Sequence, residues 1–144
     1  MKLVIFDCDG TLVDSQNIIA ESMRLAFAAE RLDWPGREAT LSIVGLSLAE
    51  AFARLVPDLP ADVRATLADR YREAFFRLRQ DPAHHEPAFE GALDAIEALG
   101  RRSGVMLGIA TGKSRRGVDA VLERFGLGGR FATIQTADDA PSKP

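Results

Sequence analysis

Three short apolar runs recur along the chain, and longer segments with helical periodicity separate them. The first run, KLVIF at 2–6, is rich in β-forming residues and stops at a charged turn that contains a glycine. VMLGIA at 105–110 ends in the same way at TGKS, and FATIQT at 131–136 is a weaker third run. Short continuous apolar runs are typical of strands that are buried on both faces, as in a parallel sheet. We therefore predict three parallel strands.

Helices are predicted between these strands from apolar residues at helical spacing. Residues 16–31 place Ile19 and Phe27 on one stripe, and either Asp14 or Ser15 is suited to cap the start of that helix. The same reasoning predicts further helices over residues 48–56, 61–80, 92–99 and 115–125.

The stretch between the first two strands is far longer than a strand–helix–strand crossover requires. Such a crossover needs only about a dozen residues plus its helix. Residues 15–85 instead carry several helical segments in succession. We therefore predict an α/β fold with a Rossmann-like parallel-sheet core, formed by residues 1–14 and 86–144, and an inserted α-helical cap over residues 15–85.

Composition narrows the class of protein. The chain is 47% hydrophobic and 27% charged, which is ordinary for a globular domain. Its net charge of −3 gives no indication of a nucleic-acid or membrane-surface partner, and no stretch reaches the roughly 18 apolar residues of a membrane span. The single cysteine, Cys8, excludes an internal disulfide, so we expect a cytoplasmic protein. None of these features sets an oligomeric state.

Candidate chemistry begins in VIFDCDGTLVDS at 4–15, where Asp7 and Asp9 directly follow the first strand. The carboxyl end of a strand is where open α/β sheets bind ligands. Two carboxylates this close repel each other unless a cation or a shared proton offsets them, and Mg²⁺ prefers oxygen ligands. Gly10 and Thr11 allow a sharp turn with free backbone N–H groups, which favours an anion such as phosphate. Together these features indicate phosphoryl transfer through an aspartyl phosphate.

The acidic pair has other interpretations. Two aspartates after a strand are also typical of a simple turn, and the pair alone does not exclude it. A calcium-binding EF-hand loop starts in the same way, but it needs a glycine at its sixth position and a glutamate at its twelfth. Here the glycine is fourth and Ile18 is twelfth, so the EF-hand is excluded.

Two further polar residues follow the later strands. Thr111 ends the second strand ahead of a helix that starts near Ser114, and its hydroxyl and the first helical amides could hold a phosphate. Thr111 could equally be a plain helix-entry residue. TGKS resembles the end of a Walker A loop, but Leu107 stands where that loop needs glycine. Lys143 follows the third strand, where it could neutralise a phosphate and a nucleophile or simply be solvated.

In combination these residues resemble the haloacid dehalogenase superfamily. The DxDGT motif is matched at Asp7–Thr11, the second motif by Thr111 and the third by Lys143–Pro144. The run FDCDGTLVDS is similar to the phosphoglycolate-phosphatase-like branch. The helical insertion resembles the C1 cap of that branch, and PAFEGALDAIEAL at 87–99 resembles its return from the cap to the core.

The resemblance implies a Mg²⁺-dependent phosphatase that acts on a small phosphorylated metabolite such as 2-phosphoglycolate. Asp7 would be the nucleophile that takes up the phosphoryl group. Asp9 would protonate the leaving oxygen and then activate water to hydrolyse the aspartyl phosphate. The Asp7 carboxylate and the Asp9 carbonyl would hold the Mg²⁺.

The remaining site residues follow from the same resemblance. Thr111 and the Gly112 amide would bind the phosphate, and Gly10 and Lys113 are further candidates for substrate binding. Lys143 would orient the nucleophile and stabilise its charge. The cap would close over the substrate and exclude water.

One part of the family pattern is not found. The fourth motif is an acidic pair after a fourth strand, and Asp138–Asp139 is no convincing substitute because it precedes the lysine. We therefore expect the front part of a longer phosphatase, with weak Mg²⁺ binding, little turnover and an exposed apolar edge at KLVIF.

Alternatives to a phosphatase are a sugar-phosphate mutase of the same family and a non-catalytic binding module. A signalling receiver domain is disfavoured, because its phosphorylated aspartate follows the third strand and it has no insertion after the first.

Overall fold

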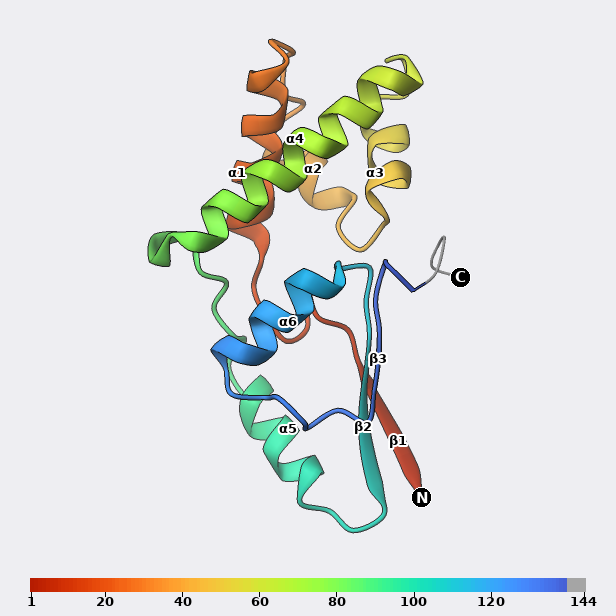
Figure 1. The fold of residues 1–144 in the computed structure, drawn as a ribbon, viewed down its shortest axis with the longest axis vertical. Coiled ribbons are helices and arrows are strands. Elements are labelled where there is room, and N and C mark those ends of the chain that lie inside the picture. Colours follow the sequence, from red (N-terminus) through yellow and green to blue (C-terminus); the bar gives the residue numbers. More distant parts are fainter. Residues whose placement is uncertain (140–144) are drawn as a thin grey trace. The chain divides into compact units, whose positions relative to one another are not determined.

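The computed structural model describes residues 1–139 and has the predicted α/β fold with a parallel sheet (Figure 1). Its elements, in chain order, are β1 (Lys2–Phe6), α1 (Gln16–Ala29), α2 (Arg37–Ser42), α3 (Leu48–Leu55), α4 (Ala61–Gln80), the 3₁₀ helix η1 (Pro82–His84), α5 (Ala92–Gly100), β2 (Val105–Ala110), α6 (Arg115–Arg124) and β3 (Thr133–Gln135).

The chain divides into two compact units. The sheet unit comprises Met1–Asp14 and the chain from Ala88 onward, and the helical unit comprises Ser15–Pro87. Each unit has a hydrophobic core of its own. The polar side chains predicted to carry chemistry belong to the sheet unit.

The sheet has the strand order β1-β2-β3, and both pairings are parallel. Val4 lies opposite Leu107, and Gly108 lies opposite Thr133. Helices α5 and α6 lie on the same side of the sheet (Figure 1). Their apolar side chains pack against those of β1 and β2. The buried residues of this core are Cys8, Leu12, Val13, Ile96, Leu107, Ile109, Val118, Val121, Leu122 and Leu127.

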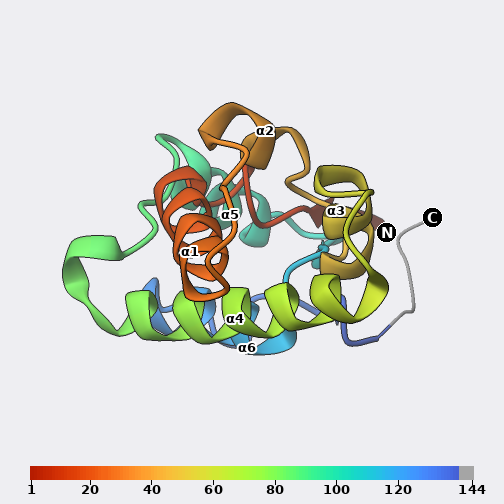
Figure 2. The same ribbon diagram turned by 90° about the horizontal axis from the view of Figure 1, so that it is seen from above.

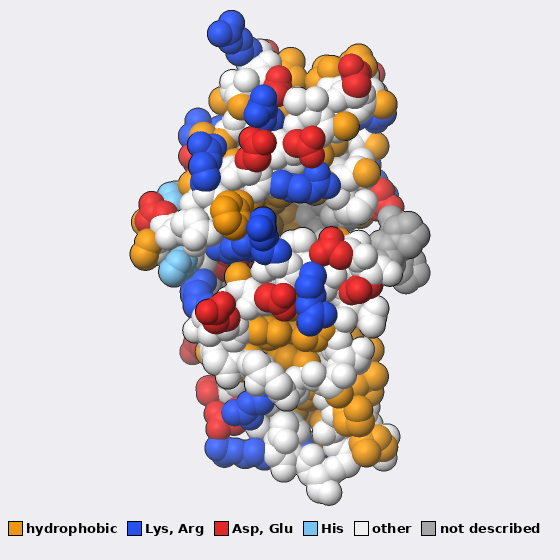
Figure 3. Space-filling model, viewed as in Figure 1, with side chains coloured by type: hydrophobic (Ala, Val, Ile, Leu, Met, Phe, Trp, Pro, Cys, Tyr) orange, Lys and Arg blue, Asp and Glu red, His pale blue; other side chains and the backbone are white. Residues whose placement is uncertain are grey.

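The other face of the sheet is largely open. Leu3 is 50% exposed, Ile5 is 56% exposed and Met106 is 42% exposed. Figure 3 shows hydrophobic side chains gathered on the surface where β1 runs. The prediction that KLVIF is buried on both faces is therefore wrong for this chain, because the described helices that pack on the sheet lie on one side only. The predicted exposed apolar edge is present.

The helical unit is built around the contact of α1 with α4, and α3 packs on α4 as well (Figure 2). Its core contains Met23, Phe27, Ile43, Ala51, Phe52, Leu67 and Ala68. Within this unit, the indole Nε1 of Trp34 donates to Thr40 Oγ1 at 2.9 Å, which ties the segment before α2 to that helix.

Two local predictions need correction. Ser15 lies at the N-cap position of α1 but makes no side-chain capping bond; its hydroxyl instead donates to Glu86 Oε2 at 2.6 Å, and both residues are buried. Strand β3 is shorter than predicted at both ends. After it, the backbone N–H and hydroxyl of Thr136 bond to Asp139, so the chain turns there.

Candidate active site

The register of the sheet brings the first two motifs together. Phe6 pairs with Ile109, so the residues that follow β1 and β2 emerge at the same edge of the sheet. Asp7 and Asp9 follow β1, and Thr111 and Lys113 follow β2. This juxtaposition is the one that ligand sites of open α/β sheets use.

The turn after β1 is held by backbone hydrogen bonds. The carbonyl of Cys8 accepts the N–H groups of Thr11, Leu12 and Val13 at 3.2, 2.9 and 3.2 Å, and Gly10 N–H donates to the Val13 carbonyl at 3.0 Å. Gly10 has a φ of +80°, a conformation that favours glycine. The expectation of free N–H groups at Gly10 and Thr11 is therefore wrong, because the turn itself uses both.

The two aspartates have different surroundings, although both are partly buried. Asp7 Oδ1 accepts the N–H of Cys8 at 2.7 Å, which fixes the direction of that carboxylate. Cys8 itself is fully buried in the core, as the alternation of side chains in an extended segment predicts.

Asp9 forms an ion pair with Lys113. The distance from Lys113 Nζ to Asp9 Oδ1 is 2.9 Å, and the side chains are 6% and 17% exposed. A pair this well shielded from water is screened far less by salt than a surface ion pair. Lys113 was predicted as a substrate-binding residue, and the structure places its ammonium on the second aspartate.

Thr111 is buried beside this pair. Its Oγ1 accepts the N–H of Lys113 at 3.1 Å, and its own N–H donates to the Gln135 carbonyl of β3 at 3.0 Å. Because the hydroxyl acts as an acceptor in that bond, its hydrogen can point to another oxygen. Gly112, between Thr111 and Lys113, is partly exposed.

The start of α6 is already capped by side chains. Ser114 Oγ accepts the N–H of Gly117 at 3.2 Å, and Asp138 Oδ2 accepts the N–H of Arg115 at 2.8 Å. Two of the first amides that could hold a phosphate are thus occupied. Sequence reasoning missed this use of Asp138, although an aspartate in a loop is a common cap or turn residue.

Lys143 lies outside the described residues. Among residues 1–139, no group of three or more His, Cys, Asp or Glu side chains is placed to hold a metal ion. The donor set at Asp7 and Asp9 nevertheless suits Mg²⁺, which binds oxygen and is commonly held by one or two carboxylates while keeping several waters.

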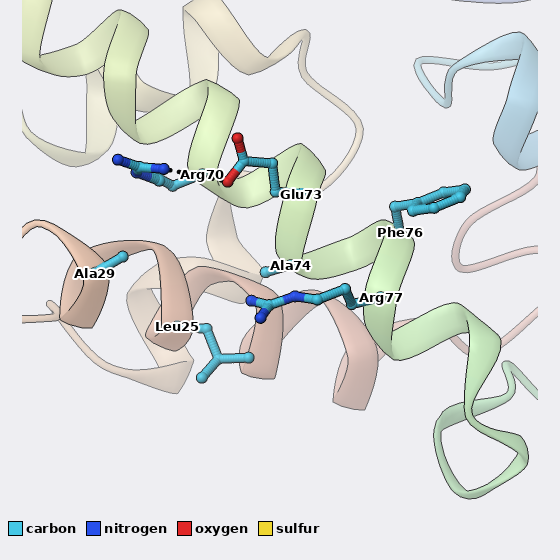
Figure 4. A pocket seen from close by; sticks show the side chains of 7 residues that line it. All are labelled: Leu25, Ala29, Arg70, Glu73, Ala74, Phe76 and Arg77. Atoms are coloured by element: carbon cyan, nitrogen blue, oxygen red, sulfur yellow. Dashed lines mark hydrogen bonds and ion pairs between the residues drawn. The ribbon is translucent and has the colours of Figure 1, made fainter.

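The helical unit has a surface groove between α1 and α4 (Figure 4). It is lined by Leu25, Ala29, Arg70, Glu73, Ala74, Phe76 and Arg77. Arg70 forms ion pairs with Glu30 and Glu73 at 2.8 and 3.3 Å. None of the residues predicted to carry chemistry lines this groove. Among the described residues, no helix is long and apolar enough to span a membrane.

Two known phosphatases are similar in sequence to this chain. The probable phosphatase IndB of Dickeya dadantii is 34% identical over 136 residues, which cover 94% of this chain and 59% of that protein. The pyrophosphatase PpaX of Halalkalibacterium halodurans is 30% identical over 142 residues, which cover 96% of this chain and 61% of that protein. The chain thus spans about three fifths of the length of these relatives.

The chain also resembles a solved structure and matches a family model. The crystal structure of a predicted phosphoglycolate phosphatase from Haemophilus somnus 129pt superposes with a TM-score of 0.85 at 22% identity, over 100% of this chain and 66% of that one. This likeness establishes the shared fold. The family model of haloacid dehalogenase-like hydrolases matches residues 4–144. The chain therefore belongs to the haloacid dehalogenase-like hydrolase family.

Proposed function

We propose that this chain belongs to a Mg²⁺-dependent phosphatase acting on a small phosphorylated metabolite. The observation that carries the proposal is the meeting of Asp7 and Asp9 with Thr111 and Lys113 at one edge of the sheet. Family membership and the phosphatase relatives support it.

The two aspartates would divide the chemistry between them. An Asp7 oxygen attacks phosphorus and forms an aspartyl phosphate, while the bond from phosphorus to the ester oxygen breaks. Asp9, protonated for this step on the carboxyl oxygen other than the one that bonds Lys113, gives its proton to that ester oxygen. Asp9 then takes a proton from water, which attacks phosphorus and releases inorganic phosphate and the free Asp7 carboxylate. Holding Asp7 through the Cys8 N–H supports this role, because it limits the directions in which the nucleophile can point.

The Asp7 carboxylate and the Asp9 carbonyl would hold Mg²⁺, which supplies positive charge opposite the phosphate oxygens. Thr111 and the Gly112 amide would bind those oxygens, with Lys113 close by. Lys143 would orient Asp7, and Gly10 serves the site by shaping the turn.

The helical segment over 15–85 would be the C1 cap that selects the leaving group, with 1–14 and 86–144 as the catalytic core. The substrate proposal is 2-phosphoglycolate or a similarly small ester, since FDCDGTLVDS is typical of that branch. We also propose a cytoplasmic location, consistent with the single buried cysteine, and neither nucleic acid nor membrane as a partner.

The experiment is a phosphate-release screen with Mg²⁺, run on the full-length protein and on the 144-residue chain. Its substrates include 2-phosphoglycolate, pyrophosphate and sugar phosphates. We expect Asp7→Asn to lower kcat by at least about 1,000-fold, because it removes the nucleophile. The matched control is Asp58→Asn, which removes the same charge from an exposed turn of the helical unit.

Full activity of Asp7→Asn would contradict the proposal. Isomerisation of a sugar phosphate without phosphate release would instead identify a mutase. Absence of turnover in the full-length protein on every ester would favour a binding module.

A further inference from the structure

Gly117 is a buried glycine inside the first turn of α6. A glycine within a helix costs about 0.5–1 kcal/mol relative to alanine, so its presence there needs a reason. Its backbone does not supply one, because Gly117 is not among the glycines with positive φ.

The reason is that a side chain at position 117 would have no room. A Cβ atom added at Gly117 would lie 2.8 Å from Cε, 2.9 Å from Cγ and 3.2 Å from Cδ of Lys113. Distances under 3.0 Å are essentially never found for real Cβ atoms. The stem of the lysine therefore lies directly across the bare backbone of the glycine.

The backbone of Lys113 is fixed at both ends. Its N–H donates to Thr111 Oγ1 at 3.1 Å, and its carbonyl accepts the N–H of Ala137 at 3.1 Å. The lysine cannot avoid a new neighbour by shifting its backbone without breaking these bonds. The path of its side chain to Asp9 thus depends on the room that Gly117 leaves.

We propose that Lys113 and Gly117 are positioning residues for Asp9. Lys113 holds the aspartate through its ammonium group, and Gly117 leaves the space that the lysine side chain needs to reach it. This inference rests on the proposed function for its catalytic consequence. A lysine stem has four rotatable bonds, and confinement against α6 reduces the orientations that its ammonium can take. The ammonium then holds one carboxylate oxygen of Asp9, which directs the other oxygen.

The first test is spectroscopic and needs no turnover. The chain has only three lysines, Lys2, Lys113 and Lys143, so ¹⁵N-lysine labelling gives a simple set of side-chain ammonium signals. Exchange with water is slowed at a buried, hydrogen-bonded ammonium, so we expect the Lys113 signal to persist. Asp9→Asn should shift this signal and leave that of Lys2, on the first strand, unchanged.

The matched glycine variants are Gly117→Ala and Gly100→Ala. Gly100 ends α5, and a Cβ there would meet Leu107 Cδ1 at an ordinary 3.8 Å. We expect Gly117→Ala to shift or broaden the Lys113 signal and Gly100→Ala to leave it in place. A Lys113 signal that is unchanged in both Asp9→Asn and Gly117→Ala would overturn the inference.

The second test measures kinetics on the full-length protein. Gly117→Ala should lower kcat by roughly 10-fold to 100-fold with KM changed by less than about twofold, as expected for a misplaced catalytic group. Gly100→Ala should keep both values. A raised KM with unchanged kcat would overturn the positioning role and make Lys113 a substrate ligand. Because the spectral test is independent of turnover, failure of the proposed phosphatase activity alone would leave its result standing.

Discussion

At the scale of single residues, Ser22 of α1 is unusual because its hydroxyl is fully buried and has no hydrogen-bond partner among residues 1–139. Its exposure is 0%, and Oγ makes no hydrogen bond with any described residue. Burying an unsatisfied hydroxyl costs about 1–3 kcal/mol, and serine is also a weaker helix former than alanine.

Replacing this serine should therefore stabilise the protein. We expect Ser22→Ala to raise the free energy of unfolding by about 1 kcal/mol, measured by urea denaturation of the 144-residue chain. The matched control is Thr40→Val, because the equally buried Thr40 hydroxyl accepts from Trp34 and donates to the Gly36 carbonyl at 2.8 Å. The free energy of unfolding of the Thr40→Val control should fall by about 1–2 kcal/mol. An equal fall in the free energy of unfolding of Ser22→Ala and Thr40→Val would contradict the prediction that the Ser22 hydroxyl destabilises the fold.

Some residues of the site could be predicted from the sequence and others could not. Asp7 and Asp9 could be identified from the sequence, because one short motif follows a recognisable strand. The contact of Asp9 with Lys113 could not be found in this way, because the two residues lie 104 positions apart in the sequence and the register of β1 with β2 brings them together. Gly117 carries no sequence signal of its own, since its role is defined by the stem of a neighbouring side chain.

At the scale of elements, α6 connects the site to the loop after β3. Asp138 accepts the Arg115 N–H at the start of the helix, where a negative charge is also favoured by the helix dipole. The cap therefore fixes the segment that carries Thr111 and Lys113 to the chain that leads towards Lys143.

Removing this cap should loosen the first turn of α6. We expect Asp138→Ala to speed hydrogen exchange of the Arg115 amide by roughly fivefold, since losing a capping acceptor costs about 1 kcal/mol. Exchange of the Val118 amide, which bonds to the Ser114 carbonyl inside the helix, should change less. The control is Asp119→Ala, because the Asp119 carboxylate accepts from the side chain of Arg115 and not from its backbone N–H. Equal exchange of the Arg115 amide in both variants would show that the cap contributes nothing.

The elements themselves followed from sequence to different degrees. The prediction of 61–80 coincides with α4, because prolines bound the segment at Pro60 and Pro82 and a long stripe runs between them. Strand β2 was equally clear as an uninterrupted apolar run. Helix α2 was missed, because its six residues are too short for an apolar stripe to develop.

At the scale of the whole molecule, the described helices that pack on the sheet cover one of its faces. Parallel sheets are normally buried on both faces, yet α5 and α6 pack together on the side of Val4 and Leu107. Leu3 and Ile5 of the edge strand β1 are half exposed on the other side. An exposed apolar edge strand is a template for pairing with another chain.

The 144-residue chain should therefore associate with itself through this face. We expect concentration-dependent association by sedimentation velocity, and Ile5→Lys should shift the chain towards monomer because a charged lysine interrupts the exposed apolar patch of this face. The melting temperature of Ile5→Lys should change little, since the Ile5 side chain is 56% exposed. The control is Val44→Lys, a substitution at a 36% exposed residue of the helical unit, which should leave association unchanged. Association that persists in Ile5→Lys but disappears in Val44→Lys would place the contact on the helical unit, and the open sheet face would then not drive assembly of this chain.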